Sequence, residues 1–193
     1  KLRQCLAHID ELEAHRKEIE SEILQIAEPF SAVLDLLYTL PGLDKNPMTA
    51  IAILSEIGPD MSVFPSSKHL VSWAGCCPRN DQSNQKVKSR RISRAGSYLK
   101  PLLVQVANAL IKSKKHPEFK ERYHRIKSRR GHKKAIIAVC KMLLTAIWNM
   151  LSKLEPYNPK GFLEHRPVKQ EKTLTVSQAL ELLRLRGYTI TNQ

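Results

Sequence analysis

The chain has 193 residues, of which 42% are hydrophobic, and its 32 Lys and Arg outnumber its 18 Asp and Glu to give a net charge of +14. This length supports one moderate hydrophobic core with appendages. No apolar run approaches the roughly 18 residues of a membrane span, and a charged helix replaces a secretory h-region, so a cytoplasmic protein is expected. The four cysteines have neither the spacing of a zinc site nor that of a disulfide framework.

The positive charge is concentrated between Gln82 and Leu154. This stretch holds nineteen Lys or Arg and only two acids, Glu118 and Glu121. A local surplus of cations is typical of a surface that binds phosphates with a salt-dependent affinity. Nucleic acid is therefore the favoured partner, although an acidic protein or a membrane surface would also be attracted by such charge. No membrane partner is expected.

The first 40 residues repeat apolar positions every seven residues. The a positions are Leu2, Ile9, Arg16, Ile23, Phe30 and Leu37, and the d positions are Cys5, Leu12, Ile19, Ile26, Val33 and Leu40. A stripe this narrow, flanked by charged residues, predicts a coiled-coil helix that joins copies of the chain; packing of the stripe within one chain is the alternative. Pro29 predicts that the long helix ends near Ala27 or Glu28 and that a second begins at Pro29.

The turn at Leu40-Pro41-Gly42-Leu43 is close to that of a helix-hairpin-helix element. In such an element, backbone N–H groups at a helix N-terminus bind a phosphate without reading bases. Asp44 stands where a second glycine is usual and the loop is longer, so an ordinary connection between helices is an equal alternative.

Caps and apolar spacing predict six further helices. They span Asn46 to Gly58, Ser66 or Ser67 to Ala74, Ser97 as the N-cap to Ile111, Pro117 to about Arg129, about Lys133 to Leu154, and Thr175 to Gly187. The second of these is expected to bury Leu70, Val71 and Trp73. The helix from Lys133 is apolar nearly all round and is expected to be the central core helix.

The predicted fold class is all-α, with an N-terminal coiled-coil helix followed by a compact helical domain that contains the helix-hairpin-helix-like element and a basic loop. Prolines and a glycine after Leu154 predict a linker. The expected regions are residues 1–40, 41–155 and 156–193.

The polar segment from Pro78 to Leu99 contains Ser83. Five cations follow this serine within eleven residues, namely Lys86, Lys88, Arg90, Arg91 and Arg94. Cations at this spacing would stabilise the charge that develops when a serine hydroxyl attacks a phosphodiester. No histidine lies nearby to act as a base, and Asp81 is a weak candidate. Taken alone, Ser83 is an ordinary loop serine. Its rivals are Ser89, Ser93 and Ser97, of which Ser97 is better explained as an N-cap.

The ordered set of segments over residues 40–155 resembles a known family. The runs that carry the resemblance are LPGL, TAIAILSEIG, LVSWAGCCPR, QSN, ISRAGSYLKPLLVQVA and FKERYHRIKSRRGHKKAIIAVCKMLLTAIWNML. They resemble the C-terminal transposase domain of the DEDD insertion-sequence transposases, the bridge-RNA-guided recombinases of the IS-one-ten group. A preceding coiled-coil helix is also a feature of that family.

The resemblance implies a transposase or site-specific recombinase that works as an oligomer with DNA and a guide RNA. It implies that Ser83 is the catalytic nucleophile, with Asn84 where the family has glycine; asparagine is the residue that best tolerates the positive φ of such a turn after glycine. It also implies an upstream RuvC-like half whose four acids bind Mg²⁺. This chain would then be a C-terminal fragment that holds no cofactor and is inactive alone.

The residues expected to contact nucleic acid are Lys86, Lys88, Arg90, Arg91, Arg94, Lys100, Arg122, Arg125, Arg129, Arg130, Lys133, Lys134 and Gly42. No metal ligand is expected in this chain. Two other functions stay open: a non-catalytic helix-hairpin-helix-like module that binds nucleic-acid backbones, and a coiled-coil scaffold whose basic face binds an acidic protein. A transposase or recombinase of this kind is expected in the bacterial cytoplasm, associated with the nucleoid.

Overall fold

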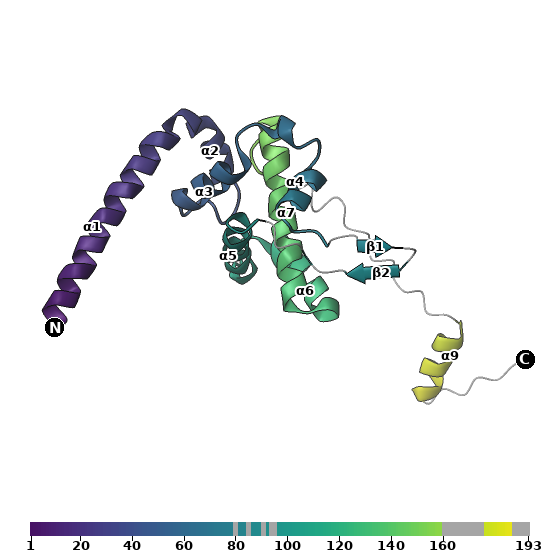
Figure 1. Ribbon diagram of the computed structural model, residues 1–193. Coiled ribbons are helices and arrows are strands. Elements are labelled where there is room, and N and C mark those ends of the chain that lie inside the picture. Colours follow the sequence, from purple (N-terminus) through teal and green to yellow (C-terminus); the bar gives the residue numbers. More distant parts are fainter. Residues whose placement is uncertain (79–80, 84–85, 90–91, 93–95, 160–175, 187–193) are drawn as a thin grey trace, which may run out of the picture. The chain divides into compact units, whose positions relative to one another are not determined.

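The structure is a computed structural model that describes residues 1–78, 81–83, 86–89, 92, 96–159 and 176–186 (Figure 1). Contacts divide the chain into two units, Lys1–Asn158 and Pro159–Gln193. Within its described residues, the second unit contains helix α9 (Val176–Leu185). This helix lies where the sequence predicts one, and the expected end residues Thr175 and Gly187 fall outside the described residues.

Helix α1 (Leu2–Ala27) ends where the sequence predicts, because Pro29 has no N–H to continue the helical hydrogen bonds. A 3-10 turn, η1 (Glu28–Phe30), follows, and the Glu28 N–H donates to the carbonyl of Gln25. Helix α2 (Ser31–Tyr38) then begins, two residues later than predicted. The tighter 3-10 turn accommodates the proline and delays the next α-helix.

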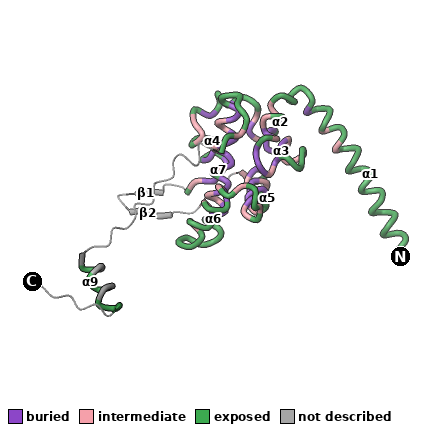
Figure 2. The backbone as a smooth tube through the Cα atoms, turned by 180° about the vertical axis from the view of Figure 1, so that it is seen from behind, coloured by how far each residue is buried: buried purple, intermediate pink, exposed green. Residues whose placement is uncertain are grey.

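The heptad stripe divides at this bend. Leu37 and Leu40 are 0% exposed and belong to the core, whereas Leu2 is 78% and Ile26 is 74% exposed. Figure 2 shows α1 as an exposed helix for most of its length. Packing within one chain therefore covers the end of the stripe and leaves the apolar side chains of α1 uncovered.

Helix α7 (His132–Lys153) is the centre of the core, as predicted. Helices α2, α4 (Ser67–Trp73), α5 (Leu99–Lys112) and α6 (Pro117–Arg130) all pack on it. Its side chains Leu143, Leu144 and Ile147 are 0% exposed. By length and composition alone α7 could cross a membrane, but the four helices around it account for its apolar character.

The short helices confirm most of the predicted caps. Helix α3 (Pro47–Ile57) begins at Asn46, whose side chain accepts the Met48 N–H at 3.0 Å, and ends at Gly58. The 3-10 turn η2 (Met61–Val63) leads to α4.

Two local predictions are wrong. Trp73 is 46% exposed, because Leu70 and Val71 fill the buried side of the short helix α4 and leave Trp73 against the edge of Phe64, with ring centres 5.6 Å apart. Ser97 is not the N-cap of α5. That position is Tyr98, and the Gly96 carbonyl accepts the Lys100 N–H at 3.0 Å.

The mainly helical fold class is confirmed, but the predicted basic loop contains a β-hairpin. Strands β1 (Asp81–Ser83) and β2 (Lys86–Ser89) pair antiparallel, with a register irregularity between Asp81 and Gln82. Strands of three and four residues are too short, and too poor in β-branched residues, to show the alternating pattern that identifies strands in a sequence.

Candidate nucleic-acid interface

A dense group of cations surrounds the turn between α6 and α7. Gly131 makes this turn with a φ of +81°, a conformation that favours glycine. Its N–H donates to the carbonyl of Lys127 at 3.0 Å, and its own carbonyl accepts the N–H of Ala135 at 3.2 Å. We call the five exposed cations around the turn the basic tip: Lys127, Arg129, Arg130, Lys133 and Lys134.

A buried tyrosine joins the two helices beneath the basic tip. Tyr123 of α6 is 6% exposed, and its hydroxyl is hydrogen-bonded at 2.7 Å to Nδ1 of His132, the first residue of α7. The ammonium of Lys127 lies 5.4 Å from the centre of the Tyr123 ring, within cation–π range. These contacts fix the start of α7 against the end of α6.

The charge at the start of α7 is unfavourable for the helix itself. A helix N-terminus carries a partial positive charge, so acidic side chains stabilise it and cations do not. Helix α7 instead begins with His132, Lys133 and Lys134, and it has neither an acidic first turn nor a side-chain cap. The first-turn N–H groups of α7 receive no side-chain cap, and two lysines lie beside them. Together they favour an anion from another molecule, and a phosphate can bind both the N–H groups and the lysines.

No acid compensates the basic tip from within the described part of the chain. The ion pairs found there join His8 to Glu11, Arg16 to Glu20, and His116 to Glu118, and none includes a tip residue. The tip cations therefore keep their charge available for a partner, with a strength that salt will screen.

The other basic residues predicted on helices differ in exposure. Arg125 is exposed one turn before Arg129, and its carbonyl accepts the Arg129 Nε–H at 3.5 Å. Arg122 is half-buried; burial and then the neighbouring Arg125 lower its pKa, and its Nε has no hydrogen-bond partner among the described residues. Lys100 is half-buried at the start of α5, near Cys76 and Cys140 of the core. The structure thus brings Arg125 to the basic tip but not Lys100.

Gly42 has a clear packing role. Its φ is +88°, and a Cβ atom at this position would lie 2.9 Å from Val106 Cγ1 of α5. The Gly42 N–H donates to Oδ1 of Asp44 at 3.1 Å, so this donor already has a partner. Close approach of the turn to α5 is sufficient to require glycine here, and a phosphate contact at Gly42 stays a prediction.

Ser83 is the last residue of β1, next to the hairpin turn. In the register of the hairpin it pairs with Lys86, while Gln82 pairs with Val87. The backbone thus places the predicted nucleophile directly opposite one of its predicted cations, with Lys88 further along β2. Other predicted residues of this segment lie outside the described residues: Asn84, Arg90, Arg91 and Arg94.

Two close backbone approaches lie near the base of this hairpin. Pro78 and Ile92 form an isolated antiparallel bridge between the two arms of the segment. Gly96 has a φ of +70°, and a Cβ atom there would lie 2.6 Å from the carbonyl oxygen of Ala74, at the end of α4. The role of Gly96 could not be predicted, because a close backbone approach leaves no pattern in one sequence.

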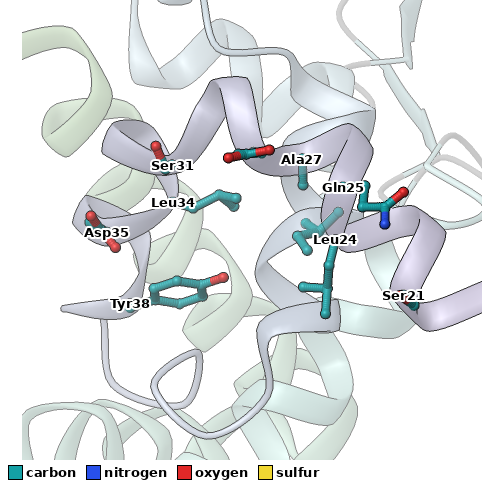
Figure 3. Close-up of a pocket in the computed structure, with 10 residues that line it drawn as sticks. Ser21, Leu24, Gln25, Ala27, Ser31, Leu34, Asp35 and Tyr38 are labelled. Carbon is teal, nitrogen blue, oxygen red and sulfur yellow. The ribbon is translucent and has the colours of Figure 1, made fainter. Parts of the chain in front are cut away.

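The cavity at the bend between α1 and α2 is a poor phosphate site. It has a volume of about 380 Å³, and Figure 3 shows Leu24, Leu34 and Tyr38 directed toward it. Its lining also includes the carboxylates of Glu28 and Asp35, and burial followed by the charge of Asp35 raises the pKa of Tyr38. Acidic groups repel phosphates, so the cavity and the basic tip have opposite electrostatic character.

The residues that the structure describes contain no group of three His, Cys, Asp or Glu that could hold a metal ion. Three histidines are spaced eight residues apart, at His116, His124 and His132. The rings of His124 and His132 both lie against Tyr123, whereas His116 lies near Glu118. The side chains of the described residues therefore do not provide the ligands that a Mg²⁺ ion needs.

Comparisons with known proteins find one family model and two relatives that match this chain. Residues 34–124 match the model of the transposase IS116/IS110/IS902 family. A pilin gene-inverting protein of Moraxella bovis is 30% identical over 127 residues, and one of Moraxella lacunata is 28% identical over 127 residues. Each alignment covers 65% of this chain but only 38% of the relative. No solved structure matches the chain. From the middle of α2 to the middle of α6, the chain is thus similar to the transposases of the IS116/IS110/IS902 family.

Proposed function

We propose that this chain is the part of a DNA transposase or site-specific recombinase that holds nucleic-acid backbones and supplies a serine nucleophile. The basic tip carries the proposal: five exposed cations at the uncapped N-terminus of α7, without acidic partners among the described residues. The family match over residues 34–124 and the two pilin gene-inverting relatives support a role in recombination.

Backbone binding is tested directly with the chain itself. Duplex DNA should bind with little sequence preference, and the affinity should fall steeply as salt rises, because cations and helix N-termini contact phosphates and not base edges. Fluorescence anisotropy between low and moderate ionic strength measures this. An affinity that does not change with salt would contradict the proposal.

In the proposed reaction the Ser83 oxygen attacks a phosphorus atom of DNA. A serine–phosphate bond forms as the bond between phosphorus and one DNA oxygen breaks. A base takes the serine proton, and the leaving oxygen takes up a proton to become a free hydroxyl end. Lys86, its partner across the hairpin, would stabilise the added negative charge. The base, and the Mg²⁺-binding acids of a RuvC-like half, belong to the proposed upstream part of the protein, so this chain alone should not cleave DNA.

The full-length protein tests the nucleophile. Ser83→Ala should abolish the covalent protein–DNA adduct on denaturing gels while DNA affinity stays nearly unchanged, because a neutral hydroxyl contributes little to phosphate binding. Ser89→Ala in the same hairpin is the matched control and should still form the adduct. If Ser83→Ala also forms it, the nucleophile lies elsewhere.

Adduct formation and the choice of ligand together distinguish the competing functions. A non-catalytic backbone-binding module would bind DNA with the same salt dependence and yield no adduct with any variant. A scaffold for an acidic protein would bind an acidic polypeptide in preference to duplex DNA of equal charge. A guide RNA as partner predicts that a structured RNA competes with duplex DNA for the basic tip.

We further propose that α1 joins two copies of the chain. Its uncovered d positions include Leu12 and Ile19, which are 54% and 56% exposed. In a parallel pair, the g residues His8 and His15 would face the e residues Glu13 and Glu20 of the second copy, whereas an antiparallel pair would bring Glu13 against Glu13. Avoiding this contact between like charges favours the parallel arrangement. The proposed location of the protein is the bacterial cytoplasm, near the nucleoid.

Arg16 is the seam position that opposes a parallel pair, because it would face its own copy. On its own helix, Nε of Arg16 lies 3.6 Å from Oε1 of Glu20. This contact draws the guanidinium toward the edge of the seam and balances part of its charge. Replacing Ile19 and Ile23 by polar residues should give monomers with a folded helical body, as measured by light scattering; a monomeric parent chain would contradict the proposal.

A further inference from the structure

A second group of exposed cations lies at the opposite end of α6 from the basic tip. Lys112 ends α5, and Lys114 and Lys115 follow it before Pro117 begins α6. All three lysines are exposed, and the Lys115 N–H donates to the hydroxyl of Ser113 at 3.2 Å, which shapes the connection. We call Lys112, Lys114 and Lys115 the turn cluster. The sequence did not single out these residues.

The acid nearest to the turn cluster is already engaged. The side chain of Glu118 is only 7% exposed, and it accepts the hydroxyl of Tyr157 at 3.1 Å and lies 3.7 Å from His116 Nδ1. Tyr157 is held in place because its ring stacks on Phe119 and its N–H donates to Thr39 Oγ1 at 2.9 Å. The charge of Glu118 is thus directed inward, and the turn cluster keeps a positive outer field.

Exposed residues of α6 connect the two groups. Lys120, His124 and Lys127 follow one another at spacings of four and three, so they share one side of the helix, and all three are exposed. In Figure 2, exposed residues (green) lie along α6. The acid beside this side of the helix is Glu121, which follows Lys120 directly and has an interaction of its own. Helix α6 therefore carries positive charge from one end to the other.

The spacing of the two groups selects a class of ligand. Helix α6 has 14 residues, which at 1.5 Å per residue separates its ends by about 21 Å. Neighbouring phosphates of one strand are about 3.4 Å apart along the axis, and the minor groove is about 6 Å wide. The major groove, at about 12 Å plus the phosphates on its two edges, is nearer to the reach of two flexible groups of cations at this separation.

We infer that α6 bridges a groove of duplex DNA, with the basic tip on the phosphates of one strand and the turn cluster on those of the other. This inference rests on the proposed function, since it assumes that the basic tip binds DNA. It adds a second phosphate-binding site, at Lys112, Lys114 and Lys115, and a preference for duplex over single-stranded ligand.

Three variants of the full chain, each lacking three exposed cations, test this bridging. The turn variant replaces Lys112, Lys114 and Lys115 by Ala, the tip variant replaces Arg129, Arg130 and Lys133, and the control replaces Arg3, Lys17 and Lys45. Binding of a 20-base-pair duplex, and of one strand of it, is measured by anisotropy across a salt series. Each lost phosphate contact lowers the salt slope by about 0.9 on duplex DNA.

The turn and tip variants should each lower the salt slope on duplex DNA by about 2 to 3. A variant that combines both sets of substitutions should lower the slope by the sum of the two effects. The control variant should leave the slope unchanged. On the single strand, where each lost contact lowers the slope by about 0.7, the turn variant should lower it by less than about 1 in total. A turn variant that binds duplex like the parent, while the tip variant is weakened, would overturn the bridging and leave the proposed function intact. A parent chain without any salt dependence would overturn both. A loss of about 2 on the single strand, which is about 0.7 for each of the three lysines, would also overturn the bridging.

Discussion

Helices α1 and α7 are the two longest helices of the described chain, and both carry apolar stripes, but only the stripe of α7 is buried. The stripe of α7 is covered by α2, α4, α5 and α6, and its Ile147 is 0% exposed. The stripe of α1 is left in solvent, with Ile9 50% and Ile19 56% exposed. The width of the stripe explains the difference: α7 is apolar nearly all round, as a core helix requires, and α1 has the narrow a/d seam of a helix that pairs with one partner.

The largest expected difference between the two helices is in folding stability. Leu143→Ala on α7 should lower the free energy of unfolding by about 2 to 5 kcal/mol, because it removes a fully buried side chain and leaves a cavity. Ile19→Ala on α1 should change it by less than about 0.5 kcal/mol at protein concentrations where the chain is monomeric. Urea unfolding followed by circular dichroism measures both. Equal losses would mean that α1 packs on its own chain.

Tyr157 extends the comparison to the residues that cover α6. Its ring stacks on Phe119 and its hydroxyl donates to Glu118. Tyr157→Phe should cost about 1 to 3 kcal/mol, since it leaves the largely buried Glu118 without its hydroxyl donor. Burial, and then the charge of Glu118, raise the pKa of Tyr157, so the hydroxyl stays protonated and donating across the ordinary pH range. Tyr98→Phe, at an exposed tyrosine, is the control and should unfold like the parent. An unchanged Tyr157→Phe would show that Glu118 finds another donor.

Thiol reactivity compares the same two helices without altering either. Cys5 on α1 is exposed and should react with a thiol reagent at pH 8, whereas Cys140 on α7 is buried and should react only after unfolding. Burial raises the pKa of Cys140 to about 12 and that of Cys76 to about 11. Mass spectrometry of the labelled sites over time measures the difference.

The sign of the pH effect follows from these raised pKa values. Unfolded thiols ionise near pH 8.5, while the folded chain holds both protons to a higher pH. The contribution of Cys76 and Cys140 to stability is therefore present below about pH 8.5 and is lost as the pH rises toward 12. Labelling of Cys140 at pH 8 as fast as that of Cys5 would contradict the buried position of α7.

The smallest change tests the partner of α1. Cys5 is a d residue, so in a parallel, in-register pair its two copies would lie within the roughly 4.4–6.8 Å Cα separation of a disulfide. In an antiparallel pair they would lie near opposite ends of a helix about 39 Å long. Mild oxidation should therefore give a disulfide-linked dimer on non-reducing gels.

Single cysteine variants control this experiment. Cys5→Ser should remove the linked dimer, and Cys77→Ser, at the half-buried cysteine next to α4, should keep it. A linked dimer that persists without Cys5 would place the contact elsewhere. Oxidised Cys5 chains that stay monomeric would favour the antiparallel pair or no pair.

Much of the helical framework could be predicted because its signals are local. Asn46 and Pro47 mark the start of α3, Pro29 marks the end of α1, and Gly131 marks the turn between α6 and α7. Caps and prolines act on their own neighbours, so one sequence shows them. The exposure of Trp73 and the hairpin at Ser83 escaped prediction, because they depend on which residues of a short helix meet α7 and on the pairing of very short strands.

The candidate site follows the same division. The amino-acid sequence by itself determined that residues 82–154 carry the positive charge and that the first helix carries a narrow apolar seam. Both are properties of residue type and order. Only the tertiary structure decided that the Tyr123–His132 contact seats the basic tip, that Glu118 turns inward to Tyr157, and that Gly96 fits against Ala74. Each of these depends on the packing of segments distant in sequence or on a backbone approach of a few ångströms, and such distances arise only when the helices assemble around α7.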